Sequence, residues 1–172
     1  QSHKDDLPFF FLEMNTRLQV EHPITEEILG VDLVELQINI AAGKKLDIDI
    51  DKVIPSGHAI EARIYAEDPK NDFLPSPGSI KALNLSKEGR FDFGVRSGDF
   101  VSTYYDPMLG KVIVHSNNRE EARAKLISCL EELKVQGIET NTDFLSYILN
   151  SEIFRKDIIQ ITDLDDLALK FK

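Results

Sequence analysis

Two oxygen-bearing side chains, Glu13 and Asn15, stand two positions apart in a segment where polar and apolar residues alternate. Side chains on one face of an extended segment follow each other at about 6.6 Å, so both oxygens can approach a single cation. Magnesium prefers hard oxygen ligands and leaves its other positions to water or phosphate, whereas zinc selects His or Cys. The four histidines have no ligand-like spacing with Cys129. The pattern therefore favours a magnesium site over a zinc site.

A cation, an amide and a carboxylate follow on the same face of this segment, at Arg17, Gln19 and Glu21. The arginine fork can donate two parallel hydrogen bonds to a small carboxylate-like anion, and a neighbouring Glu can accept its proton. In a straight strand, however, Glu13 and Glu21 would lie about 26 Å apart. A turn or bulge just before Pro23 is therefore needed if these groups are to share one site.

A further cation, Arg63, lies on the polar side of a second alternating segment whose other side is apolar. Such a strand would hold the base of the side chain rigidly and let the guanidinium group meet an anion. Glu61, two residues earlier on the same face, is expected to pair with it. The plainer interpretation remains open, because charged residues on a half-buried strand are usually a solvated face and exposed ion pairs contribute little.

The elements that would position these groups are read from hydrophobic periodicity and from turn residues. Alternation predicts strands, and apolar stripes at helical spacing between capping residues predict helices. Asp32 is the expected N-cap of one helix, and Gly30 is expected to end a short helical turn before it. The expected strands are 9–21, 58–65, 80–85, 93–96 and 111–115, and the expected helices are 25–30, 32–42, 119–133, 141–149 and 163–171. This order predicts an α+β fold, a mostly antiparallel sheet with helices packed on it.

Composition narrows the classes of function. The chain has 172 residues, of which 42% are hydrophobic, and carries 20 Lys and Arg against 30 Asp and Glu, a net charge of −10. That balance argues against a nucleic-acid-binding protein, because the long-range field repels phosphates. The longest apolar run, Phe9 to Leu12, is too short to span a bilayer. The chain starts at Gln1 and enters a strand pattern almost at once, so we expect a piece of a longer protein, since a strand needs a partner.

Several long motifs, in order along nearly the whole chain, resemble those of the biotin carboxylase component of biotin-dependent carboxylases, within the ATP-grasp superfamily. Members include acetyl-, propionyl- and methylcrotonyl-CoA carboxylases. The motifs are Phe11–Pro23 (FLEMNTRLQVEHP), Gly57–Pro69 (GHAIEARIYAEDP), Leu74–Gly78 (LPSPG), Tyr104–Met108 (YYDPM) and Gly137–Asn141 (GIETN). The resemblance implies a C-terminal portion of such an enzyme, with residues 1–45 as the end of the ATP-grasp region and 46–172 as the biotin carboxylase C-terminal domain.

The resemblance also implies a two-step reaction, in which ATP and bicarbonate give carboxyphosphate and the released carbon dioxide is captured by N1′ of biotin. It assigns Glu13 to ATP binding and, with Asn15, to binding of Mg²⁺ or Mn²⁺. It assigns bicarbonate to Arg17, Gln19, the backbone of Val20 and Glu21. Glu21 would be the base that removes the bicarbonate proton. Arg63 would bind biotin and stabilise the enolate-like biotin anion.

Other family parts are missing from this sequence: the glycine-rich lid, an ATP-contacting lysine, a further metal-binding glutamate and the biotin-bearing lysine motif. We therefore expect the chain alone to be inactive. The implied partners are a biotin carboxyl carrier domain and a carboxyltransferase, which chooses the final acceptor. A homodimer through the C-terminal domain and a cytoplasmic or mitochondrial-matrix location are implied as well.

Two alternatives remain at this point. Another ATP-grasp ligase would also use Glu and Asn for magnesium, but it would leave the motif around Arg63 unexplained. A non-catalytic assembly module is the second, since the strands and helices after residue 80 are large enough for a subunit interface.

Overall fold

The computed structural model describes residues 10–46, 48–156 and 159–171. Its centre is an antiparallel three-stranded sheet in the order β1-β8-β6, with three two-stranded pairs, β2-β3, β4-β7 and β5-β9, around it. The strands are β1 His58–Tyr65, β2 Glu67–Asp68, β3 Leu74–Pro75, β4 Gly78–Ser79, β5 Ala82–Asn84, β6 Arg90–Phe93, β7 Phe100–Val101, β8 Met108–Ser116 and β9 Lys134–Gln136. The helices are α1 His22–Leu29, α2 Leu33–Ala41, α3 Arg119–Glu132, α4 Thr142–Asn150 and α5 Ile161–Phe171, with short 3-10 turns Ile50–Lys52 and Pro69–Asn71. The predicted α+β class with antiparallel pairing is confirmed.

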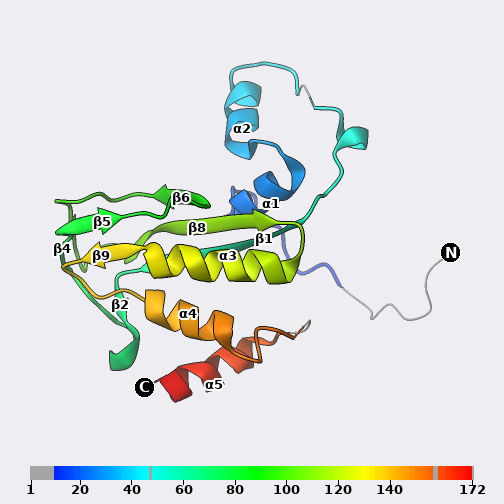
Figure 1. Cartoon of the computed structure of the whole chain (residues 1–172). Helices are drawn as coiled ribbons and strands as arrows, with labels where there is room; N and C mark the ends of the chain where they lie inside the picture. The colour runs from blue at the N-terminus through cyan, green and yellow to red at the C-terminus, as the bar shows by residue number, and fades with distance from the viewer. Residues whose placement is uncertain (1–9, 47, 157–158, 172) are drawn as a thin grey trace.

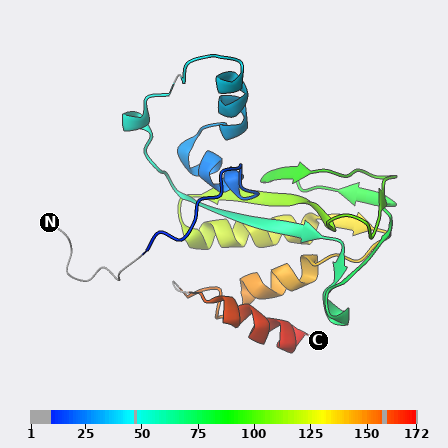
Figure 2. The same ribbon diagram turned by 180° about the vertical axis from the view of Figure 1, so that it is seen from behind.

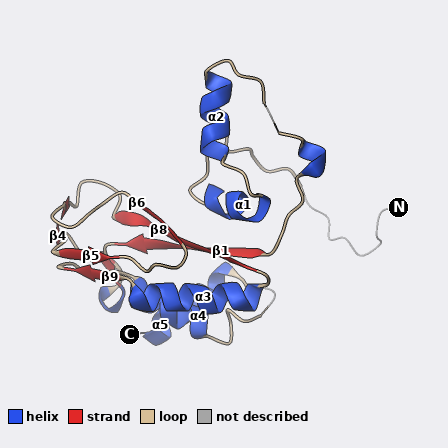
Figure 3. Ribbon diagram, turned by 45° about the horizontal axis from the view of Figure 1, so that its top comes forward, coloured by secondary structure: helices blue, strands red, loops and turns tan. Residues whose placement is uncertain are grey.

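Helices cover the two faces of the central sheet unequally. α3 packs along β1 and β8 on one face, α4 packs against α3, and α5 lies beyond α4 (Figure 1). α1 packs on β1 and β8 from the other side, and α2 leads away from it (Figure 3). Seen from behind, the N-terminal segment runs past the α1 side of the sheet (Figure 2). Side chains that point toward α1 therefore lie beside the segment that carries most of the predicted site residues.

The core lies between the sheet and α3. Ile64, Val112 and Ile80 are 0% exposed, and Leu126 on α3 is 1% exposed, as expected when apolar faces of a strand and a helix meet. A second cluster joins α4 and α5, where Phe144 packs edge-to-face on Phe171 with ring centroids 5.2 Å apart. The sheet strands are thus held rigidly from the α3 side, and this fixes the bases of the side chains on the opposite face.

Local signals predicted several elements well. Asp32 caps α2 by accepting a hydrogen bond from the Glu35 backbone N–H at 2.7 Å, and Gly30 ends α1 with a φ of 67°. Strand 58–65 matches β1, and the helices expected at 119–133 and 141–149 match α3 and α4 within one residue at each end. The strand expected at 93–96 instead ends at Phe93, because its pairing with β8 runs from Arg90 to Phe93.

Candidate functional site

The segment before α1 is not a strand in the described residues, so the strand predicted from 9 to 21 is wrong there, and Phe9 lies outside them. The side chains expected to be buried are open to solvent, with Phe10 85%, Leu12 90% and Met14 74% exposed. Alternation favours an extended segment, but a strand also needs a neighbour for its backbone groups. None of the strand pairs in the described chain includes this segment.

The predicted turn before Pro23 is present. The His22 backbone N–H donates to the Gln19 carbonyl at 3.2 Å, and the Ile24 N–H donates to the Glu21 carbonyl at 3.1 Å. Pro23 lies in the first turn of α1, where its fixed φ suits the helix and its missing N–H costs nothing. The turn redirects Glu21 out of the line of the segment and toward the sheet.

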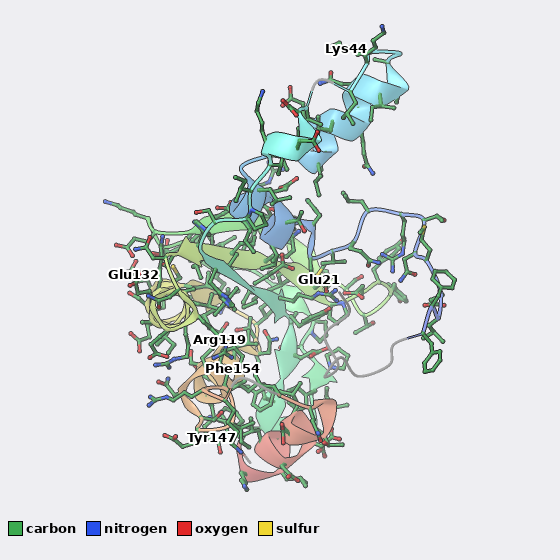
Figure 4. The ribbon with its side chains drawn as sticks, turned by 90° about the vertical axis from the view of Figure 1, so that its right-hand side faces the viewer. Glu21, Lys44, Arg119, Glu132, Tyr147 and Phe154 are labelled. Atoms are coloured by element: carbon green, nitrogen blue, oxygen red, sulfur yellow. The ribbon has the colours of Figure 1, made fainter. Side chains whose placement is uncertain are left out.

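Glu21 and Arg63 meet, although 42 residues separate them in the sequence. The Arg63 guanidinium group donates to the Glu21 carboxylate and, at 3.3 Å, to the Tyr65 hydroxyl. These side chains remain accessible, Arg63 being 37% and Glu21 49% exposed. The hydrogen bonds with Tyr65 and Glu21 raise the pKa of Arg63. Figure 4 shows Glu21 where the N-terminal segment meets the sheet. A cation and a candidate base thus lie side by side at a solvent-accessible site.

Arg17 and Gln19 lie together just before the turn. An Arg17 guanidinium nitrogen donates to the Gln19 side-chain oxygen at 3.1 Å and to the Leu18 carbonyl at 3.3 Å, and Arg17 and Gln19 are both exposed. The hydrogen bond between their side chains makes Arg17 and Gln19 a local pair, close to Glu21 in sequence. The side chains of both residues are accessible to solvent.

Lys111 is a residue of this site that the sequence analysis did not identify. Lys111 on β8 is directly opposite Arg63 on β1, is 8% exposed, and donates from Nζ to the Val20 carbonyl at 2.8 Å. The available signal was a lysine inside an otherwise apolar strand, from Met108 to Val114. Such a cation is rarely buried without a partner.

The expected ion pair between Glu61 and Arg63 is wrong, because Arg63 pairs with Glu21. Both carboxylate oxygens of Glu61 are buried, and neither has a hydrogen-bond partner within the residues that the structure describes. Burial raises the pKa of Glu61 to about 7, against the lowering effect of Lys111 and Arg63, while the negative charges of Glu21 and Asp92 raise it further. A carboxyl group that can be neutral near pH 7 therefore lies beside the Glu21–Arg63 pair.

Glu13 and Asn15 are exposed on the N-terminal segment. Their carboxylate and amide oxygens suit magnesium by chemical type. Across residues 10–46, 48–156 and 159–171, no group of three or more His, Cys, Asp or Glu side chains could hold a metal ion. These two residues thus offer only part of a coordination shell.

Among the helices in residues 10–46, 48–156 and 159–171, none has the length and hydropathy needed to cross a membrane.

Family models match two parts of the chain. Residues 61–166 match the biotin carboxylase C-terminal domain, and residues 2–49 match the carbamoyl-phosphate synthase L chain ATP-binding domain. The first match covers more than half of the chain and includes Arg63 and Lys111. The second includes Glu13 through Glu21.

Curated relatives agree with the family matches. The chain is 49% identical over 140 residues to the mitochondrial methylcrotonoyl-CoA carboxylase subunit alpha of Mus musculus, covering 80% of this chain and 20% of the relative. It is 49% identical over 150 residues to biotin carboxylase 2 of Bacillus subtilis, covering 86% and 34%. The chain therefore spans about a fifth to a third of the length of these two relatives.

Solved structures show the same arrangement. The biotin carboxylase domain dimer of Hydrogenobacter thermophilus 2-oxoglutarate carboxylase, in complex with MgADP, ADP and bicarbonate, matches with a TM-score of 0.89 and 38% identity over 95% of this chain and 36% of that one. The Kluyveromyces lactis urea carboxylase matches with a TM-score of 0.81 and 48% identity, over 86% and 13%.

Proposed function

The chain belongs to the biotin carboxylase C-terminal domain family, and from that premise we propose that it forms the bicarbonate- and biotin-facing part of an ATP-dependent biotin carboxylase. In this reaction ATP and bicarbonate give carboxyphosphate, and the carbon dioxide released from it carboxylates biotin on a carrier. The observation that carries the proposal is the meeting of Glu21 and Arg63 at a solvent-open place.

The chemistry of this pair suits the reaction. Glu21 is the general base that takes the bicarbonate proton, and the hydrogen bond from the adjacent Arg63 holds its carboxylate in place. Arg63 is also the donor that meets the negative charge developing on biotin, held in place by a strand with a packed opposite face. Arg17, Gln19 and the Val20 backbone hold bicarbonate, where the exposed Arg17 fork supplies two parallel hydrogen bonds.

Glu13 and Asn15 bind Mg²⁺ or Mn²⁺ in this proposal, and Glu13 also contacts ATP. Their hard oxygens fit such an ion, and the remaining ligands come from phosphate and from water. The metal ion, when bound, neutralises phosphate charge. Glu13 and Asn15, on the exposed segment, orient the metal ion and the phosphate that it binds.

We propose that residues 1–45 end the ATP-grasp region and that residues 46–172 form the C-terminal domain. The two family matches, over 2–49 and 61–166, support a division between them. The chain alone is expected to be inactive toward ATP. Biotin-stimulated ATP hydrolysis by the chain alone would contradict this.

The proposed partners are a biotin carboxyl carrier domain, a carboxyltransferase and a second copy of the same chain. The Hydrogenobacter biotin carboxylase structure is a domain dimer, which supports the homodimer. The mouse relative is mitochondrial, and the Bacillus relative is bacterial, which supports a mitochondrial-matrix or cytoplasmic setting. Light scattering on the chain tests the dimer, and a strict monomer would count against it.

Arg63→Ala in the longer protein that carries these residues tests the proposal. We expect biotin carboxylation to fall at least a hundredfold while bicarbonate-dependent ATP hydrolysis is partly retained, because Arg63 meets the biotin anion. Arg155→Ala, a half-exposed arginine in the turn after α4, is the matched control and should keep both activities. Unchanged biotin carboxylation in Arg63→Ala would refute the assignment.

Another ATP-grasp ligase is the second candidate, favoured by the match of residues 2–49 to a carbamoyl-phosphate synthase ATP-binding domain. The same experiment separates the two. A protein that hydrolyses ATP with bicarbonate but never carboxylates free or carrier-bound biotin would support this candidate.

A further inference from the structure

The backbone beside Glu21 is tied to the sheet by Lys111, a residue that the proposed chemistry leaves without a role. Its ammonium group donates to the Val20 carbonyl at 2.8 Å across 91 residues of sequence. Lys111 lies opposite Arg63 in the β1–β8 register. Hydrogen bonds from a charged donor are stronger than neutral ones. One pair of strands therefore holds both Arg63 and the peptide that precedes its partner Glu21.

A series of ion pairs links the ammonium group of Lys111 to α1, the helix that follows Glu21. Asp92 on β6, opposite Lys111, has Oδ2 3.8 Å from Nζ, and Arg90 lies 2.9 Å from the same oxygen. Arg90 also reaches Oε2 of Glu26 on α1 at 2.6 Å, and Glu26 is 5% exposed. This row of alternating charges runs from β8 through β6 to α1. It holds the stretch between Val20 and Glu26 at both ends.

The position of Lys111 is costly for stability alone. Burying an ammonium group requires compensation by partners, and an apolar side chain of similar volume would avoid the penalty. Its neighbour in β8, Val112, is fully buried and apolar. Lys111 does not offer its charge to solvent, since its nitrogen is directed at a backbone carbonyl and at Asp92. A role in fixing the position of the Val20 carbonyl would explain why a lysine lies there.

We propose that Lys111 is a positioning residue for bicarbonate binding. Through the Val20 carbonyl it sets the direction of the Val20–Glu21 peptide, and so the approach of the Glu21 carboxylate to Arg63. Lys111 itself touches neither bicarbonate nor biotin. The inference rests on the proposed function for its ligand, but the geometric part can be measured without any activity.

The geometric part is tested by NMR on the chain. Labelling valine with ¹³C at the carbonyl and glutamate with ¹⁵N reports only two peptide bonds, Val20–Glu21 and Val34–Glu35, because the sequence contains just these two Val–Glu pairs. Lys111→Met should move the Val20–Glu21 signal by more than its linewidth and leave the Val34–Glu35 signal, which lies in α2, in place. An unmoved Val20–Glu21 signal would overturn the inference.

Two further variants give the controls. Lys125→Met removes a lysine that also donates to a backbone carbonyl, that of His115 at 3.4 Å, but from α3 on the other face of the sheet. It should leave both signals in place. Lys111→Arg keeps a charged donor and should return the Val20–Glu21 signal toward its original position. Should Lys111→Met fail to give the circular dichroism spectrum of the folded chain, Lys111→Gln, whose shorter amide cannot span the gap, replaces it.

The functional part is tested by kinetics in the longer protein. Lys111→Met should raise the KM for bicarbonate at least tenfold and keep the KM for ATP within twofold. Lys111→Arg should recover at least half of the loss caused by Lys111→Met. An equal loss for both substrates, or no rescue by Arg, would indicate a merely structural role and overturn the inference. A wild-type protein with no bicarbonate-dependent ATP hydrolysis would refute the proposed function instead, while the NMR result would still decide whether Lys111 positions the turn.

Discussion

Glu61 should make the stability of the chain fall as the pH rises, and Glu61→Gln should remove that fall. The carboxyl group is buried without a hydrogen-bond partner among the described residues, and burial raises its pKa from 4.5 to about 7. The unfolded chain therefore loses this proton near pH 4.5, whereas the folded chain keeps it until about pH 7. Because the folded state binds more protons between these values, the contribution of Glu61 to stability is fully present below pH 4.5 and is lost as the pH rises to about 7.

The size of the effect follows from the same shift. Ionising Glu61 in the folded chain costs about 3 kcal/mol more than in the unfolded chain, at 1.36 kcal/mol for each pKa unit. About three-fifths of that cost falls between about pH 5.5 and 8.5, a range that avoids the isoelectric point near 4.8. The residue as a whole is partly exposed, and solvent screens the charge, so we expect about 1 kcal/mol over this range.

Urea denaturation followed by circular dichroism measures this effect at about pH 5.5 and 8.5. Relative to wild type, Glu61→Gln should gain about 1 kcal/mol in free energy of unfolding at the higher pH compared with the lower one. Any constant cost of placing an amide there cancels in this comparison. Glu139→Gln, an exposed glutamate in the turn before α4, is the matched control and should follow wild type at both values. A parallel loss of stability in Glu61→Gln and wild type would contradict a raised pKa of Glu61.

Two substitutions and one thiol reaction test the core and a helix cap. Leu126→Ala should destabilise the chain by about 2–4 kcal/mol, because it opens a cavity between α3 and the sheet; a urea midpoint within error of wild type would contradict this. Asp32→Ala should cost about 1 kcal/mol by removing the N-cap of α2, seen as faster hydrogen exchange in α2 with α3 unchanged, and Asp32→Asn should restore most of it. Cys129 is buried and its pKa is raised by desolvation, so Ellman's reagent should react with it only when the chain unfolds; rapid reaction in the native state would refute this placement.

Local sequence determined the elements whose signals are contained within a few residues. Alternation from His58 to Tyr65 and a capping Asp32 depend on neighbours in the chain, and β1 and α2 appear where these signals put them. The motifs also determined the family, because residue types in a long ordered pattern identify it without coordinates. The turn before Pro23 was likewise foreseen from the reach of an extended chain.

Tertiary structure decided which of these residues meet and what surrounds them. The partner of Arg63 is Glu21, 42 residues away, rather than its near neighbour Glu61. The Val20 carbonyl meets Lys111 across 91 residues. The alternating stretch after Phe9 failed as a strand because a strand exists only with a partner, and periodicity says nothing of partners. Pairing, burial and the resulting pKa of a side chain depend on segments distant in sequence, so only the folded chain sets them.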